Sequence, residues 1–230
     1  MRSRNLGLIA LLALLLAACA GCGGSTKKSN GVASKSADAI VAAALAATNS
    51  AKSVHVSGTV PENGQQLTLD LHLAGSRGGS GWLAEKGVRA DIIRIGSKAY
   101  MKGSAAFWRS FGGTAAAQLL AGRWIVGPAN TGNFASLTPL TDLHKFVGGM
   151  LSIHGKLTKG ATTTIAGQSV IAVTDTAEGG TLYIATIGQP YPLKLVTTGT
   201  SAGKLTFDQW NAVVKLKAPK GALDISKLAH

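Results

Sequence analysis

Cysteine, aromatic residues and acidic residues are all scarce in this chain. The 230 residues include 2 cysteines, too few for a disulfide scaffold or a four-cysteine zinc site. Aromatic residues make up 5%, so any core must be built mainly from Leu, Val, Ile and Ala. Charged residues make up 14% and hydrophobic residues 46%, which excludes a disordered, highly charged tail protein. The 30 glycines follow no three-residue period, which excludes collagen.

Motifs that mark catalysis are missing as well. No two histidines have the four-residue spacing of a helical zinc site, and His55 and His72 fall on the polar faces of expected strands, where a solvated side chain is the usual outcome. The glycine-rich residues 75–79 join two strands and lack the Lys-Ser/Thr pair that grips a nucleotide. There is no Gly-x-Ser-x-Gly nucleophile elbow. We therefore expect a protein that is not an enzyme and has neither a cofactor nor a metal site.

The N-terminus has the pattern of an export signal. Arg2 and Arg4 precede an uncharged, Leu-rich run over residues 6–18, which is shorter than the roughly 20 residues that a membrane-spanning helix needs. Residues 16–19, Leu-Ala-Ala-Cys, resemble a bacterial lipobox, in which cleavage occurs just before the cysteine. This resemblance implies a signal peptide over 1–18 and a mature chain whose Cys19 carries a diacylglycerol and an N-acyl chain such as palmitate. Two alternatives stay open: modification of Cys22, or an ordinary signal peptide cleaved after Ala20.

The mature chain is basic. Without Arg2 and Arg4 the formal net charge falls from +13 to +11, which favours approach to anionic headgroups or cell-wall polymers. Nucleic acid is excluded as a partner, because the basic residues form no cluster interleaved with aromatics. Residues 19–35 are rich in Gly, Ser, Thr, Lys and Asn and predict a flexible, lipidated tether. A single folded domain is expected over 36–230.

Hydrophobic periodicity predicts an α+β domain. Residues 36–47 are Ala-rich, with Ser36 as N-cap, and predict a helix, and a second helix is expected to begin at Thr138 and Pro139. Elsewhere apolar residues alternate with polar ones, most clearly at Leu67 to Leu73, as in half-buried strands. About ten short strands, the last over residues 213–218, and a few helices predict an antiparallel sheet with the helices gathered on one side.

The apolar face of this sheet is the candidate ligand site. The predicted helices are few and Ala-rich, and aromatic side chains are scarce, so they supply little volume to fill a broad sheet. An apolar cavity that holds an acyl chain is one outcome, and a core packed by helices is the other. The candidate cavity residues are Val54, Val56, Leu67, Leu69, Leu71, Leu73, Ile171, Val173, Leu182, Ile184, Leu193 and Leu195.

The order of several segments resembles a known family, the actinobacterial lipoproteins typified by LprG and LppX, which are related in fold to the lipoprotein carrier LolA. The segments are the lipobox and tether, residues 51–58, residues 92–103 with Trp108, residues 179–184, residues 191–195, and residues 207–211. The Gly- and Ala-rich residues 112–122 depart from the family pattern. The resemblance implies a strongly curved antiparallel half-barrel with helices on its concave side, enclosing a cavity for acylated lipids.

These observations predict a lipoprotein anchored by Cys19 to the outer face of the cell membrane. It would bind an acylated lipid or lipoglycan in the cavity and hold or transfer it in the cell envelope, with an unidentified export partner. The alternative is a structural or interaction lipoprotein with a filled core, which binds a cell-wall polymer or a protein through its basic surface.

Overall fold

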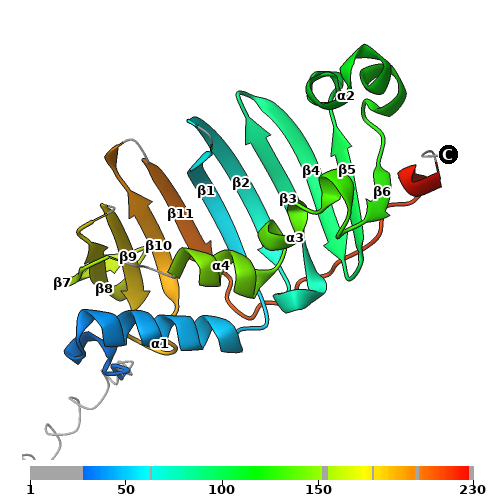
Figure 1. Ribbon diagram of the computed structural model, residues 1–230. Coiled ribbons are helices and arrows are strands. Elements are labelled where there is room, and N and C mark those ends of the chain that lie inside the picture. Colours follow the sequence, from blue (N-terminus) through cyan, green and yellow to red (C-terminus); the bar gives the residue numbers. More distant parts are fainter. Residues whose placement is uncertain (1–27, 63, 152–154, 178, 200–201, 228–230) are drawn as a thin grey trace, which may run out of the picture.

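The computed structural model describes residues 28–62, 64–151, 155–177, 179–199 and 202–227. Within these residues the chain forms one mixed sheet and four α-helices (Figure 1). The α-helices are α1 (Ala37–Ser50), α2 (Ala105–Leu120), α3 (Leu137–Leu140) and α4 (Leu143–Leu151). The strands are β1 (Val54–Glu62), β2 (Gln65–Leu73), β3 (Gly78–Glu85), β4 (Val88–Ile95), β5 (Lys98–Gly103), β6 (Ile125–Pro128), β7 (Leu157–Ile165), β8 (Gln168–Asp175), β9 (Gly180–Ala185), β10 (Pro192–Thr197), β11 (Gly203–Asp208) and β12 (Leu223–Asp224).

The sheet is open, with β12 and β7 at its edges. The strand order is β12-β6-β5-β4-β3-β2-β1-β11-β10-β9-β8-β7, and neighbouring strands are antiparallel except for the parallel pair β12 and β6. Figure 1 shows the helices gathered on one side of the twisted sheet, with α1 and α4 over one part and α2 at the β5–β6 end. The α+β half-barrel with helices on one side is thus confirmed, with twelve strands in the described residues instead of about ten.

Period-2 patterning builds the concave, helix-facing layer of the sheet. In β2, Leu69, Leu71 and Leu73 are buried, while the alternating residues between them are only half-buried. Register aligns Leu71 with Val56 of β1 and with Gly81 of β3, so neighbouring strands contribute to the same layer. A Cβ on Gly81 would lie 1.9 Å from the carbonyl oxygen of Asp70, so this position requires glycine. The missing side chain lets the backbones of β2 and β3 approach closely at this point and lets the sheet bend.

Helix α1 fills one half of the concave side. The Ser36 hydroxyl accepts a hydrogen bond from the Ala39 backbone N–H at 3.4 Å, and Asp38 complements the positive end of the helix dipole. Ile40, Val41 and Ala44 are buried, and α1 packs against α4, β7 and β8. The small alanines allow this close approach. The concave side at the β7–β11 end is therefore a dense core.

Part of the predicted tether belongs to the folded domain. Val32 is buried in the core, in a short 3-10 helix, η1 (Val32–Ser34). The Asn30 backbone N–H donates to the Thr186 carbonyl at 2.9 Å, and the Asn30 side chain donates to the Ala185 carbonyl at 3.0 Å. The prediction that the domain begins at residue 36 is corrected accordingly, because residues 28–35 find partners at the end of β9 that composition does not reveal.

The C-terminal segment also differs from the prediction. Residues 213–218 were expected as a strand, but residues 209–222 form no strand and link β11 to β12. They lie on the convex side, opposite the helices, where residues 212–215 line a small pocket with His55 and His72. Val213 is 86% exposed, so the apolar alternation here does not reflect a buried face. In the described residues, no helix combines the length and the hydropathy needed to cross a membrane.

Candidate functional site

An apolar pocket of about 1000 Å³ lies on the concave side at the β2–β6 end of the sheet. Strands β2 to β6 form its floor. Its wall consists of helix α2, residues 128–140, which end with α3, and the C-terminal 3-10 helix η5 (Ile225–Lys227). Most lining side chains are aliphatic or aromatic, among them Leu67, Leu83, Ala90, Ile92, Met101, Phe107, Trp108, Ala116, Leu120, Ile125, Phe134, Leu137, Leu140 and Ile225.

The pocket exists because small residues and a broken helix form its wall. Helix α2 leaves helical geometry at Gly112 and Gly113, and Gly113 has φ 71 and ψ −165, a conformation essentially restricted to glycine. The half that follows the kink is Ala-rich, and Ala116 faces the pocket with little volume. The Gly- and Ala-rich departure from the family pattern therefore forms one wall of the pocket.

Three aromatic residues on the first half of α2 border the pocket. The Ser104 hydroxyl caps the helix by accepting from the Phe107 N–H at 3.2 Å. Phe107 meets Trp108 edge-on at 4.9 Å and Phe111 at 4.7 Å between ring centroids. Trp108 is buried, whereas Phe111 is 60% exposed, so this aromatic cluster runs from the core to the surface.

Polar groups in the pocket lie where it meets solvent. Among the lining residues, the charged ones are Glu85 and Lys86, both exposed, at the end of β3 and in the turn that follows it. Ser110 and Ser136 add hydroxyl groups. An apolar interior with a few polar groups toward solvent suits an amphiphile, whose chain would lie inside and whose headgroup would lie at the opening.

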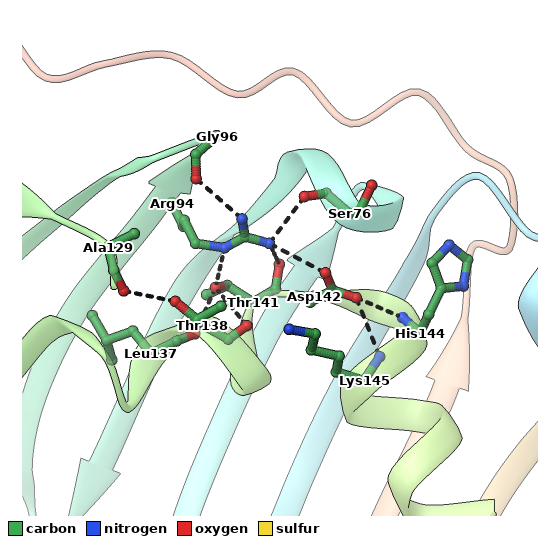
Figure 2. Close-up of polar contacts among 10 residues, drawn as sticks. All are labelled: Ser76, Arg94, Gly96, Ala129, Leu137, Thr138, Thr141, Asp142, His144 and Lys145. Atoms are coloured by element: carbon green, nitrogen blue, oxygen red, sulfur yellow. Dashed lines mark hydrogen bonds and ion pairs between the residues drawn. The ribbon is translucent and has the colours of Figure 1, made fainter. Parts of the chain in front are cut away.

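Arg94 holds the α3–α4 segment over the sheet. It extends from the concave face of β4 and is 5% exposed, and burial lowers the pKa of its guanidinium while the Asp142 carboxylate opposes that shift. Figure 2 shows its contacts with Thr141 and Asp142, in the turn between α3 and α4, and with Ser76 and Gly96. The guanidinium donates to Thr141 Oγ1 at 2.8 Å, the Thr141 carbonyl at 3.0 Å, the Gly96 carbonyl at 3.2 Å and the Ser76 carbonyl at 3.2 Å.

Asp142 completes this cluster. Its Oδ2 lies 3.7 Å from Arg94 Nη2, and its Oδ1 accepts from the backbone N–H groups of His144 at 3.1 Å and Lys145 at 3.2 Å (Figure 2). Asp142 therefore caps α4 and pairs with the buried cation at once. Because α3 contributes Leu137 and Leu140 to the pocket wall, the Arg94 cluster fixes one side of the pocket.

The structure separates the predicted cavity residues into three places. Leu67 lines the pocket. Val54, Val56, Leu69, Leu71, Leu73, Ile171, Val173, Leu182 and Ile184 lie in the packed core, and Leu195 packs against that core. Leu193 belongs to a separate cluster with Val170 and Ala185. Apart from Leu67, these side chains do not line the pocket, because α1 and α4 cover the β7–β11 end, whereas the pocket lies toward β6. The predicted anchor, Cys19, lies outside the described residues.

Sequence reasoning missed the α2 wall and the β4–β6 floor. Residues 105–120 mix aromatic, Gly and Ala residues, and neither strand nor helix periodicity marks them clearly. A usable signal was present at Ser104, three residues before the Phe107-Trp108 pair, which indicates a capped helix with two aromatic side chains in its first turn.

No protein-family model and no curated protein matches the chain. Among solved structures, it is similar to LprF from Mycobacterium bovis, with 16% identity and a TM-score of 0.58 over 80% of this chain and 97% of that one. It is also similar to the Mycobacterium tuberculosis lipoprotein LppX, with 19% identity and a TM-score of 0.52 over 78% of this chain and 99% of that one. The chain therefore has the fold of the LppX/LprG-type lipoproteins, as the order of its sequence segments predicts.

Proposed function

We propose that this chain is a membrane-anchored lipoprotein that binds an acylated lipid in the pocket beneath α2 and holds or transfers it in the cell envelope. The observation that carries the proposal is the apolar pocket of about 1000 Å³, at the upper end of the usual range for ligand sites. The shared fold of the lipoprotein LppX and the lipobox-like residues around Cys19 support the placement in the envelope.

The energetics suit reversible loading. Burying one C16 acyl chain contributes roughly 10 kcal/mol, at about 0.8 kcal/mol for each methylene. A bilayer offers nearly the same gain, so exchange between membrane and pocket is close to balanced, and the direction of transfer depends on a partner or a sink. The protein needs no bond-breaking chemistry for this role, only a dry pocket and a route into it.

Helix α2 supplies a surface for meeting the bilayer. Phe111 and Leu119 are 60% and 51% exposed, and α2 carries Arg109 but no acidic residue. A helix that carries exposed apolar side chains and a cation is suited to the interface of an anionic membrane. Contact there would place the pocket wall next to the acyl chains of the bilayer.

The alternative, a structural lipoprotein with a filled core, fits only part of the molecule. The β7–β11 end of the concave side is densely packed by α1 and α4, as that alternative requires. The β2–β6 end instead contains the pocket. The proposal of a lipid-binding protein accounts for both ends: the β7–β11 end stabilises the fold, and the β2–β6 end is open to a ligand.

Uptake of a fluorescent long-chain acyl lipid from donor vesicles by the full chain tests the proposal. Ala116→Trp places a bulky ring in the pocket wall and should abolish most of the uptake. Val213→Trp, on the exposed convex side, is the matched control and should leave uptake unchanged. Equal uptake by wild type and Ala116→Trp would contradict lipid binding in this pocket.

A further inference from the structure

Two histidines stack on the convex side of the sheet, opposite the lipid pocket. Register pairs His55 of β1 directly with His72 of β2, and their rings lie 4.4 Å apart with an angle of 20° between the ring planes. Asp70 precedes His72 by two residues on the same face of β2. Asp208 of β11 is the register partner of His55 on its other side. Three adjacent strands thus bring two imidazoles and two carboxylates together.

The ring nitrogens of His55 both face carboxylate oxygens. Nδ1 lies 2.7 Å from Asp208 Oδ1, and Nε2 lies 3.2 Å from Asp70 Oδ1. When Nδ1–H donates to Asp208, a neutral ring presents the Nε2 lone pair to the Asp70 oxygen, which is also an acceptor. Two acceptors do not bond to each other directly, and a metal ion bound by both atoms would join them.

We propose that His55, His72 and Asp70 bind a Zn²⁺ ion, and that Asp208 orients His55. Two imidazoles and one carboxylate form a common zinc ligand set that leaves one position for water. A carboxylate that accepts from the second nitrogen of a ligating histidine is the usual outer partner in such sites. The negative charges of Asp70 and Asp208 together balance a divalent cation.

One ion can bind these atoms only if the His72 ring turns out of its stack with His55, because a metal ion lies in the plane of each imidazole that it binds and the two ring planes here are only 20° apart. One ligand atom from each of the three residues lies within 4.8 Å of the others. Tetrahedral zinc with ligands at about 2.0–2.1 Å separates its ligand atoms by about 3.4 Å, so the required closure is modest. The two histidines border a small convex pocket of about 240 Å³, which gives the rings space to turn and also admits Lys215, whose flexible stem can withdraw its ammonium group.

Helical zinc-site spacing does not reveal this cluster, because its residues come from a hairpin. The positions of His55 and His72 favour ordinary solvated side chains when each strand is considered alone. The β1–β2 register and the approach of β11 create the cluster. A bound ion would cross-link β1 and β2 at the centre of the sheet, and the hydrogen bond between His55 and Asp208 would connect it to β11.

Isothermal titration of the full chain with Zn²⁺, purified in detergent without a polyhistidine tag, tests the site. Wild type should bind one Zn²⁺ at this cluster, and Co²⁺ in its place should show the visible absorption of a low-coordinate site. His72→Phe keeps a ring stacked on His55 but removes a ligand, and should abolish this binding. Asp208→Asn should weaken binding by about 10–100-fold.

His144→Gln is the matched control, since it removes an imidazole from α4 on the other side of the sheet, and it should bind Zn²⁺ as wild type does. Circular dichroism would check that each variant is folded. Absence of Zn²⁺ binding by wild type, or unchanged affinity in Asp208→Asn and His72→Phe, would overturn the proposal. The cluster would then be a set of hydrogen bonds between His55 and the carboxylates of Asp70 and Asp208.

Discussion

Two neighbouring leucines on the concave face distinguish empty space from packed core. Leu69 and Leu83 are register partners on β2 and β3. Leu83 lines the pocket, whereas Leu69 is 1% exposed and lies in the core. Replacing each with Trp adds the same volume at both positions, but only Leu83 has empty space, that of the pocket, beside it.

Leu69→Trp should overpack the core and lower the free energy of unfolding by about 1–3 kcal/mol. For a domain of this size, that loss corresponds to a fall in melting temperature of roughly 2–12 °C. In Leu83→Trp the ring can extend into the pocket, so the loss in free energy of unfolding should be small, below about 1 kcal/mol. The same ring should displace bound lipid.

Thermal unfolding of delipidated protein and native mass spectrometry of loaded protein measure the two effects separately. Delipidation matters, because a bound lipid raises the melting temperature by mass action and would obscure the comparison. An equal destabilisation of both variants would mean that the space beneath α2 is filled and that no pocket is open there. A stable Leu83→Trp variant that loads lipid normally would place the lipid elsewhere.

Three further substitutions test the frame of the site and the anchor. Arg94→Met should lower the free energy of unfolding, measured by chemical denaturation, by about 3–5 kcal/mol, because it leaves a buried carboxylate and several carbonyls without their partner. A loss below about 1 kcal/mol would contradict the role of the Arg94 cluster in holding α3 and α4 on the sheet. Gly113→Ala, at the α2 kink, should lower the free energy of unfolding by about 1–3 kcal/mol, whereas Gly149→Ala, at a helical position with open space around it, should leave it unchanged or raise it. Equal effects of the two substitutions would contradict the need for glycine at the kink. Cys19→Ala should move the protein to the soluble fraction while Cys22→Ala should not, and membrane retention without acylation of Cys19 would remove the lipobox assignment.

Local patterning in the sequence was enough to predict the architecture. The alternation at Leu67 to Leu73 and the capped helix after Ser36 each depend on a few adjacent residues, and both elements form where they were expected. Residues 213–218 show the limit of that reasoning. Their alternation resembles a strand, but this segment pairs with no strand, and ladder partners are set by the whole chain.

The position of the pocket depends on long-range packing. Leu67 and Leu69 are equivalent in the sequence pattern, and yet one borders the pocket and the other is sealed in the core. The difference arises from where α1, α2 and α4 lie on the sheet, which Arg94 and the α2 kink help to determine. The Arg94 cluster and the kink of α2 at Gly112 and Gly113 produce no periodic pattern in the sequence, so the positions of the helices on the sheet could not be predicted from it.

Native mass spectrometry of the full chain, released gently from the membranes in which it was made, tests directly whether the pocket holds a lipid. If the pocket binds lipid, a population should appear whose mass exceeds that of the acylated chain by one long-chain acylated lipid, and Leu83→Trp should lack this population while remaining folded. Wild-type protein that carries no lipid, and still carries none after incubation with lipid vesicles, would contradict lipid binding in the pocket.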